Sequence, residues 1–139
     1  MVQSPPKLPD ASTDPKTRDT AYDQLIEAFL TAPEGAKNPA LREAGCSKKE
    51  INACVWKLLY FVEAYLHAYP ATLDSARMEN FLLNICPRVL LLASGHSPRK
   101  FLLVMEQFWR FLDRVYRQSH AAAVLELLPR IADTFEQRM

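Results

Sequence analysis

The chain of 139 residues carries 17 Lys and Arg against 16 Asp and Glu, with 49% hydrophobic and 24% charged residues. This length predicts one domain with its own core, and the composition excludes wholesale disorder. The formal net charge of +1 excludes a global attraction to nucleic acid or to an anionic membrane. Any such binding therefore depends on a local patch.

The N-terminal stretch, residues 1–13, is rich in proline and polar residues. It cannot bury enough apolar surface to offset chain entropy, so we expect a disordered leader there and a single helical domain over residues 14–139. The leader lacks the apolar region of a signal peptide, and no apolar run approaches the ~20 residues of a membrane span. The sequence therefore predicts a cytoplasmic protein with no membrane partner.

The first predicted helix begins at Asp14-Pro15, which is typical of an N-cap followed by proline at the first helical position. Apolar residues at 3–4 spacing between Tyr22 and Leu30 give it one buried stripe. Asn38-Pro39 then predicts a short second helix, which ends at Gly45.

Ser47-Lys-Lys-Glu50 has the pattern of a capping box and opens the longest predicted helix, 48–69, which stops before Pro70. This helix is apolar on most of its circumference, and such helices are usually surrounded by others. We expect it to be the central helix of the domain.

A fourth helix is predicted to begin after Asp74 or Ser75 and to be interrupted by Pro87, because proline removes a backbone donor and disfavours the helical conformation of the residue before it. Residues 88–93 either resume as a short helix or form a buried strand.

Ser97-Pro98 opens an amphipathic helix that extends to about residue 118, and a last helix over 120–137 is expected to kink at Pro129. The helix 98–118 is expected to cross the helix 48–69. The predicted fold class is all-α: an irregular bundle of five to six helices with a long central helix at about 48–69.

No combination of residues predicts catalysis. The three histidines lie on different predicted segments, and the paired Glu-x-x-His motif of di-iron bundles is absent, as are a P-loop, GxSxG and zinc-ligand spacing. Cys46, Cys54 and Cys86 have the pattern of small buried residues in a reducing compartment. We expect a protein that is not an enzyme and that holds no metal and no cofactor.

Residues 38–57 contain the strongest local motif. The stretch Leu41–Trp56, with its short helix and Ala-Gly-Cys-Ser turn, resembles the helix-turn-helix of TetR- or LacI-type regulators. The resemblance implies a DNA-binding transcriptional regulator in which one set of side chains faces DNA or its phosphates. These are Lys48, Lys49, Asn52 and Lys57. The alternative is a glycine C-cap followed by a capped helix, as between helices of any bundle.

A polar and aromatic stripe on the helix 48–69 gives the preferred hypothesis. It consists of Trp56, Tyr60, Glu63 and His67. Such a stripe lines a partner groove or a pocket, or is the solvated edge of a core helix. The aromatic residues of this helix are more than a core of this size readily hides. We therefore expect a non-catalytic protein–protein interaction module, of adaptor or scaffold type, that binds another protein or a second copy of itself. DNA binding is the alternative, and small-molecule sensing in a bundle cavity is a third class.

Overall fold

A computed structural model describes residues 7–89 and 97–139 of the chain. These residues contain six continuous helical segments and no strand, which confirms the predicted all-α bundle. In chain order the segments are α1 (Pro15–Thr31), α2 (Pro39–Glu43), α3 (Lys48–Leu66), α4 (Ser75–Asn80) continued by the π-helical turn η1 (Phe81–Ile85) and α5 (Cys86–Val89), α6 (Pro98–Phe111) continued by the π-helical turn η2 (Leu112–Tyr116), and α7 (Ala121–Arg138).

The helices begin where capping chemistry predicts. At the start of five of them, a side-chain oxygen of the residue before the helix accepts hydrogen bonds from free backbone N–H groups of the first turn. The caps are Asp14, Asn38, Ser47, Asp74 and Ser97. Because each cap satisfies donors that no helical partner can reach, it fixes the first residue of its helix.

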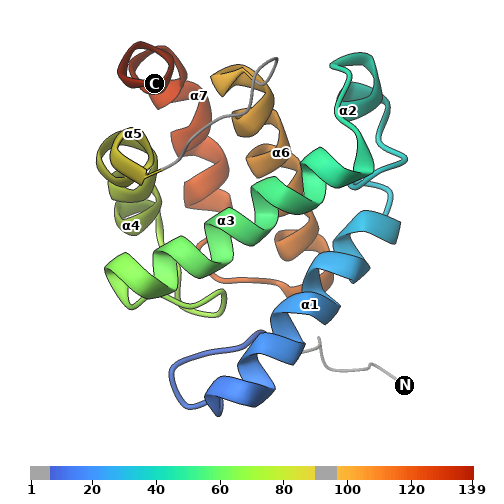
Figure 1. Ribbon diagram of the computed structural model, residues 1–139, viewed down its shortest axis with the longest axis vertical. Helices are drawn as coiled ribbons and strands as arrows, with labels where there is room; N and C mark the ends of the chain where they lie inside the picture. Colours follow the sequence, from blue (N-terminus) through green and yellow to red (C-terminus); the bar gives the residue numbers. More distant parts are fainter. Residues whose placement is uncertain (1–6, 90–96) are drawn as a thin grey trace.

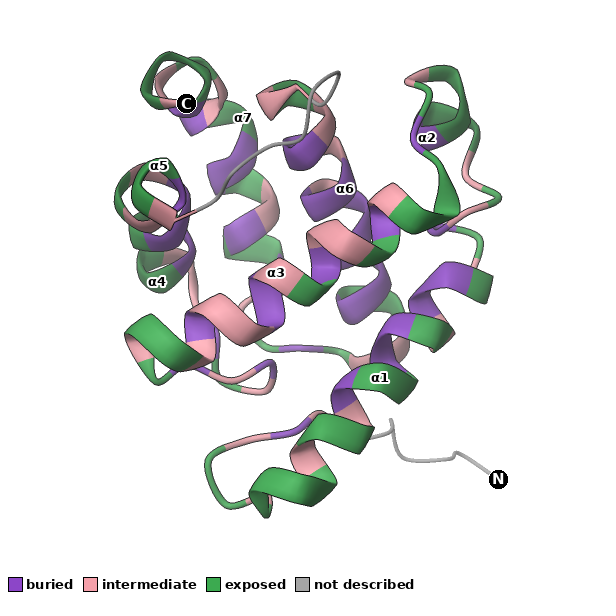
Figure 2. Ribbon diagram, viewed as in Figure 1, coloured by how far each residue is buried: buried purple, intermediate pink, exposed green. Residues whose placement is uncertain are grey.

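The bundle has α1 and α3 on one side and α6 and α7 behind them, with α4 and α5 at one edge and α2 at the other (Figure 1). The longest α-helix, α3, crosses in front of α6 and contacts α1, α6 and η1. The buried residues lie on the sides of these helices that face one another, and the exposed residues lie mainly on the outward sides (Figure 2). Eight residues of α6 are buried, including the fully buried Trp109, so α6 shares the central position with α3.

The predicted end of the central helix, near residue 69, is wrong by three residues. His67 takes a left-handed conformation with φ of 49°, and Ala68 donates its backbone N–H to the carbonyl of Val62. This arrangement closes the last turn and stops the helix at Leu66.

The predicted interruption at Pro87 is also wrong, because the helix continues through this residue to Val89. Just before the proline the helix widens into η1, where the N–H of Cys86 bonds to the carbonyl of Phe81. Proline offers no N–H to the carbonyl four residues back, which belongs to Leu83. That carbonyl accepts a hydrogen bond of 2.9 Å from the Arg138 guanidinium of α7 instead. Of the predicted segment 88–93, the structure describes 88–89 as helix, and the rest lies outside the described residues.

The segment before α1 contacts the domain. Pro9 is buried and its carbonyl accepts a hydrogen bond of 3.2 Å from the N–H of Ala71, while Leu8 packs against the core. The boundary between leader and domain after residue 13 stays a prediction, and residues 1–6 lie outside the described part of the chain.

An ion pair joins the turn after α1 to η2. The buried Glu34 accepts two hydrogen bonds from the Arg114 guanidinium, one of them 2.9 Å long. These bonds hold the pKa of the Glu34 carboxyl below its ordinary value of 4.5. The two residues are 80 positions apart, so helical periodicity could not predict this contact.

We expect Glu34→Gln to lower the free energy of unfolding at neutral pH by about 1.5 kcal/mol, because a charge-assisted hydrogen bond is lost. A depressed folded-state pKa contributes stability that is complete above the unfolded-state value and is lost as the pH falls through the folded-state value. The difference between wild type and variant should therefore shrink below pH 4.5 in urea unfolding measured across pH. A difference independent of pH would contradict this assignment.

Candidate interaction surface

The two aromatic members of the predicted stripe, Trp56 and Tyr60, lie in contact on the outer side of α3. Trp56 is 45% exposed in the middle of the helix, and its ring centroid lies 4.7 Å from that of Tyr60. Tyr60 is half-buried and meets the edge of the Tyr22 ring of α1 at 5.3 Å. The indole is therefore held by a chain of rings that ends in the core.

Glu63, the third member of the stripe, binds residues of α1 within the domain. It forms an ion pair with Arg18 of α1 and accepts a hydrogen bond of 3.3 Å from the Tyr22 hydroxyl. The Arg18 guanidinium in turn lies 4.7 Å from the centre of the Tyr69 ring. Burial, followed by the negative charge of Glu63, raises the pKa of Tyr22. This network joins α1 to the end of α3, and sequence reasoning identified neither Arg18 nor Tyr69 as part of it.

His67, the fourth member, is the left-handed residue that ends α3, and its side chain is exposed. The stripe thus stays on one edge of α3, as helical spacing predicts. Within it, Glu63 ties α3 to α1, whereas Trp56 and His67 face outward.

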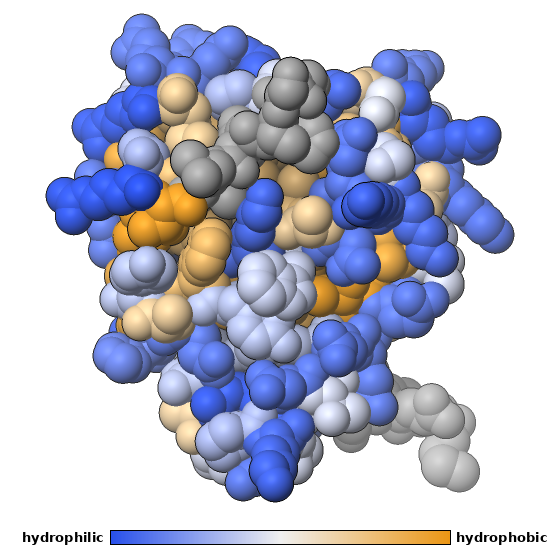
Figure 3. Space-filling model, viewed as in Figure 1, coloured by the Kyte–Doolittle hydropathy of each residue, from blue (hydrophilic) through white to orange (hydrophobic). Residues whose placement is uncertain are grey.

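A second aromatic pair lies further round α3. Tyr65 is 54% exposed, and its ring centroid is 6.1 Å from that of the half-buried Phe61. Among the described residues, Trp56 and Tyr65 are the exposed large hydrophobic side chains, and both belong to α3. Figure 3, viewed from the α3 side, shows patches of hydrophobic surface among hydrophilic side chains. Trp56 and Tyr65 are nine residues apart, which places them on opposite edges of the exposed surface of α3. We call the edge that carries Trp56 and Tyr60 the α3 aromatic face.

The residues of the helix-turn-helix hypothesis lie in the N-terminal half of α3, with Lys57 at its middle. Gly45 has a φ of 79°, which favours glycine, and Ser47 accepts a hydrogen bond of 3.1 Å from the N–H of Glu50. Three of the four predicted DNA-facing side chains are exposed, and the fourth is half-buried. The exposed ones are Lys48, Lys49 and Asn52, and the half-buried one is Lys57.

The short helix α2 is held mainly by α6. It has five residues, and its cap Asn38 donates a hydrogen bond of 3.1 Å to the Gln107 side chain. Its buried residue, Leu41, reaches the core. The pair α2–α3 therefore has the turn of a helix-turn-helix, with a first helix of little more than one turn.

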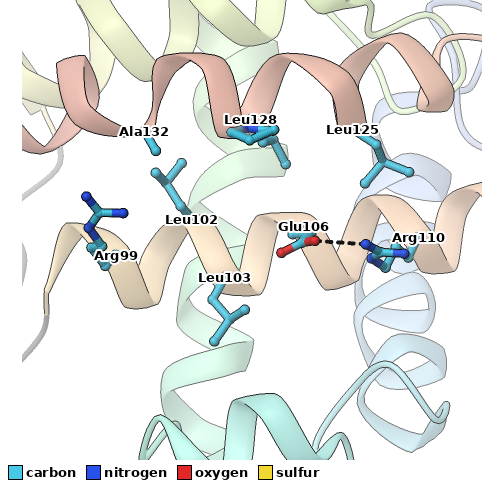
Figure 4. Close-up of a pocket in the computed structure, with 9 residues that line it drawn as sticks. Arg99, Leu102, Leu103, Glu106, Arg110, Leu125, Leu128 and Ala132 are labelled. Atoms are coloured by element: carbon cyan, nitrogen blue, oxygen red, sulfur yellow. Dashed lines mark hydrogen bonds and ion pairs between the residues drawn. The ribbon is translucent and has the colours of Figure 1, made fainter.

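A shallow groove of about 320 Å³ runs between α6 and α7. Figure 4 shows Leu102 directed toward α7, with Leu125, Leu128 and Ala132 of α7 facing α6. The charged groups at its rim are already paired: Arg99 with Asp133 and Glu136, at 2.8 and 2.7 Å, and Arg110 with Glu106 at 2.9 Å. This groove could not be predicted from the sequence, because its two walls face each other only in the folded bundle.

The cysteine thiols are placed where they are poorly reactive. Burial raises the pKa of Cys54 and of Cys86 to about 12, and it also raises the pKa of Cys46. In the part of the chain that the structure describes, no group of three His, Cys, Asp or Glu is arranged to hold a metal ion. None of the helices described there is long and apolar enough to cross a bilayer.

The chain matches no protein-family model, no curated protein and no solved structure. The geometry of its own residues is therefore the basis for a functional assignment.

Proposed function

We propose that the chain is a non-catalytic protein-interaction module and that it binds its partner through the α3 aromatic face. One observation carries the proposal: Trp56 is 45% exposed at the middle of the longest α-helix. Tryptophan and tyrosine contribute disproportionately to the binding energy of protein interfaces, and they do so best at the centre of a patch.

The support beneath Trp56 strengthens the proposal. Its ring rests on Tyr60, which rests on Tyr22, and Tyr22 is fully buried. A side chain that is held in place before binding loses little conformational entropy in a complex. The three free thiols, in Cys46, Cys54 and Cys86, support the proposed cytoplasmic location, because reduced cysteines are the rule in that compartment.

We expect Trp56→Ala to abolish partner binding while lowering the free energy of unfolding by about 2 kcal/mol, because roughly half of the side chain is buried against its neighbours. Two measurements check this: urea unfolding, and cross-linking in cells of the source organism with a photoreactive phenylalanine analogue placed at the positions of interest. A discrete cross-linked product is expected with the analogue at Trp56.

The exposed Arg130 of α7 is the matched control position. The analogue there should give no such product. The proposal fails if position 56 gives no product, or if both positions give the same one.

DNA binding through residues 38–57 is a second candidate function. The observation in its favour is that Lys48 and Lys49 are exposed next to the Gly45 turn and form no ion pair with another described residue. Fluorescence anisotropy with mixed-sequence duplex DNA tests it. Binding that falls steeply with salt and disappears in Lys48→Glu/Lys49→Glu would support it, and no binding at low salt would exclude it.

A further inference from the structure

The surface around Trp56 carries acidic residues on its α1 side. Asp19, Asp23 and Glu27 are exposed and follow one another at four-residue intervals, so they form a stripe along α1. Asp19 and Asp23 lie close enough to Tyr60 that their negative charges, after burial, raise the pKa of its hydroxyl. The acidic stripe therefore borders the Trp56–Tyr60 pair directly.

The opposite side of Trp56 carries the ammonium group of Lys57. On a helix of 3.6 residues per turn, Glu63 lies about 20° from Trp56, and Lys57 lies about 100° from it in the other direction. Since Glu63 contacts α1, Lys57 is on the side of Trp56 that faces away from α1. Trp56 is thus flanked by carboxylates on one side and by an ammonium group on the other.

The two charged sides are also level with each other along α3. Arg18 and Tyr22 of α1 contact Glu63, and Tyr22 also contacts Tyr60, so α1 runs antiparallel to α3. Asp23, the residue after Tyr22, is therefore level with Tyr60. Lys57 lies three residues further along α3, about 4.5 Å in rise, which a lysine side chain can span. Neither Asp23 nor Lys57 forms an ion pair with another described residue.

We propose that a second copy of this chain covers the surface, in a two-fold dimer with the two α3 helices side by side and parallel. The proposal rests on the function proposed above and names its partner. A two-fold axis parallel to α3 places the acidic side of one copy opposite the Lys57 side of the other. Each residue keeps its position along the direction of the helix under this rotation. Asp23 of each copy then faces Lys57 of the second copy, and the two Trp56 rings lie near the axis.

The charge pattern favours this occupant. A two-fold interface must be self-complementary, and a surface of one sign would repel its own copy. Here the carboxylates lie on one side of the Trp56–Tyr60 pair and the Lys57 ammonium group lies on the other. The formal net charge of +1 also leaves little long-range repulsion between copies.

The test is a charge exchange followed by sedimentation equilibrium from low to high micromolar concentration. The wild type should reach twice the chain mass. Asp23→Lys and Lys57→Glu should each raise the dissociation constant at least about tenfold, because like charges then face each other twice in every dimer. An equimolar mixture of the two variants should restore the dimer, since both contacts become attractive.

Two further variants are matched controls. Asp113→Lys and Arg130→Glu make the same charge changes at exposed positions on η2 and α7, and they should leave the dissociation constant unchanged. Circular dichroism checks that every variant is folded. The emission of Trp56 should shift to shorter wavelength as the wild type associates, while the buried Trp109 contributes a constant signal.

A wild type that is monomeric at every concentration would overturn the proposal, as would a dimer that the mixture of variants does not restore. Cross-linking from Trp56 separates this failure from that of the proposed function. If the wild type is monomeric and the cross-linked product contains a different protein, the dimer is contradicted and the proposed interaction function stands. No product at all would contradict both.

Discussion

Gly35→Ala is expected to lower the free energy of unfolding by about 3 kcal/mol, because it forces an extra methyl group into packed backbone. A Cβ at this position would lie 2.0 Å from the carbonyl oxygen of Phe29 and 2.9 Å from two backbone atoms of Leu30. These atoms cannot move aside easily, since the carbonyls of Phe29 and Leu30 accept the hydrogen bonds that close the turn after α1. Urea unfolding measures the loss.

Gly45→Ala is the control for this substitution. Gly45 has a φ of 79°, but its added Cβ would meet only the end of the Lys100 side chain, at 3.6 Å. The expected loss is therefore about 1 kcal/mol, the cost of a left-handed alanine. Equal losses for the two variants would contradict the steric explanation.

Trp109→Ala is expected to lower the free energy of unfolding by about 4 kcal/mol, because it leaves a large cavity at the centre of the bundle. Trp109→Phe should cost no more than about 1 kcal/mol. The indole N–H of Trp109 is buried and has no hydrogen-bond partner among the described residues. Removing an unsatisfied buried donor recovers free energy that offsets part of the smaller cavity.

Thermal or urea unfolding of the two Trp109 variants checks this prediction. The difference between alanine and phenylalanine should be about 3 kcal/mol. A loss for Trp109→Phe as large as that for Trp109→Ala would mean that the indole N–H has a partner.

Local chemistry explains which parts of the fold could be predicted from the sequence. The helix starts at Asp14 and Ser47 depend on a side chain and the three residues after it, so they are visible in the sequence. The end of α3 was missed because His67, rather than a glycine, takes the left-handed conformation. The effect of Pro87 was missed because Arg138, which bonds the freed carbonyl, is distant in sequence.

The candidate surface was predictable to a similar degree. The spacing of Trp56 and Tyr60 placed them on one edge of the helix, because helical periodicity is a local property. The same helical spacing assigned Glu63 to the stripe. Its ion pair with Arg18 depends on how α1 packs against α3, so neither helix alone predicts it. The exposure of Tyr65 depends on which neighbours pack against that side of α3, so helical spacing alone did not predict it.

The short connection between η2 and α7 bears on the order in which the chain folds. Four residues, 117–120, separate the two elements, and α6 and α7 share the most extensive helix contact among the described residues. Closing so short a loop costs little entropy, so we expect this hairpin to form early. The contact between Tyr22 and Glu63 spans 41 residues and closes later. We therefore expect the surface around Trp56 to be completed late in folding, after the α6–α7 hairpin has formed.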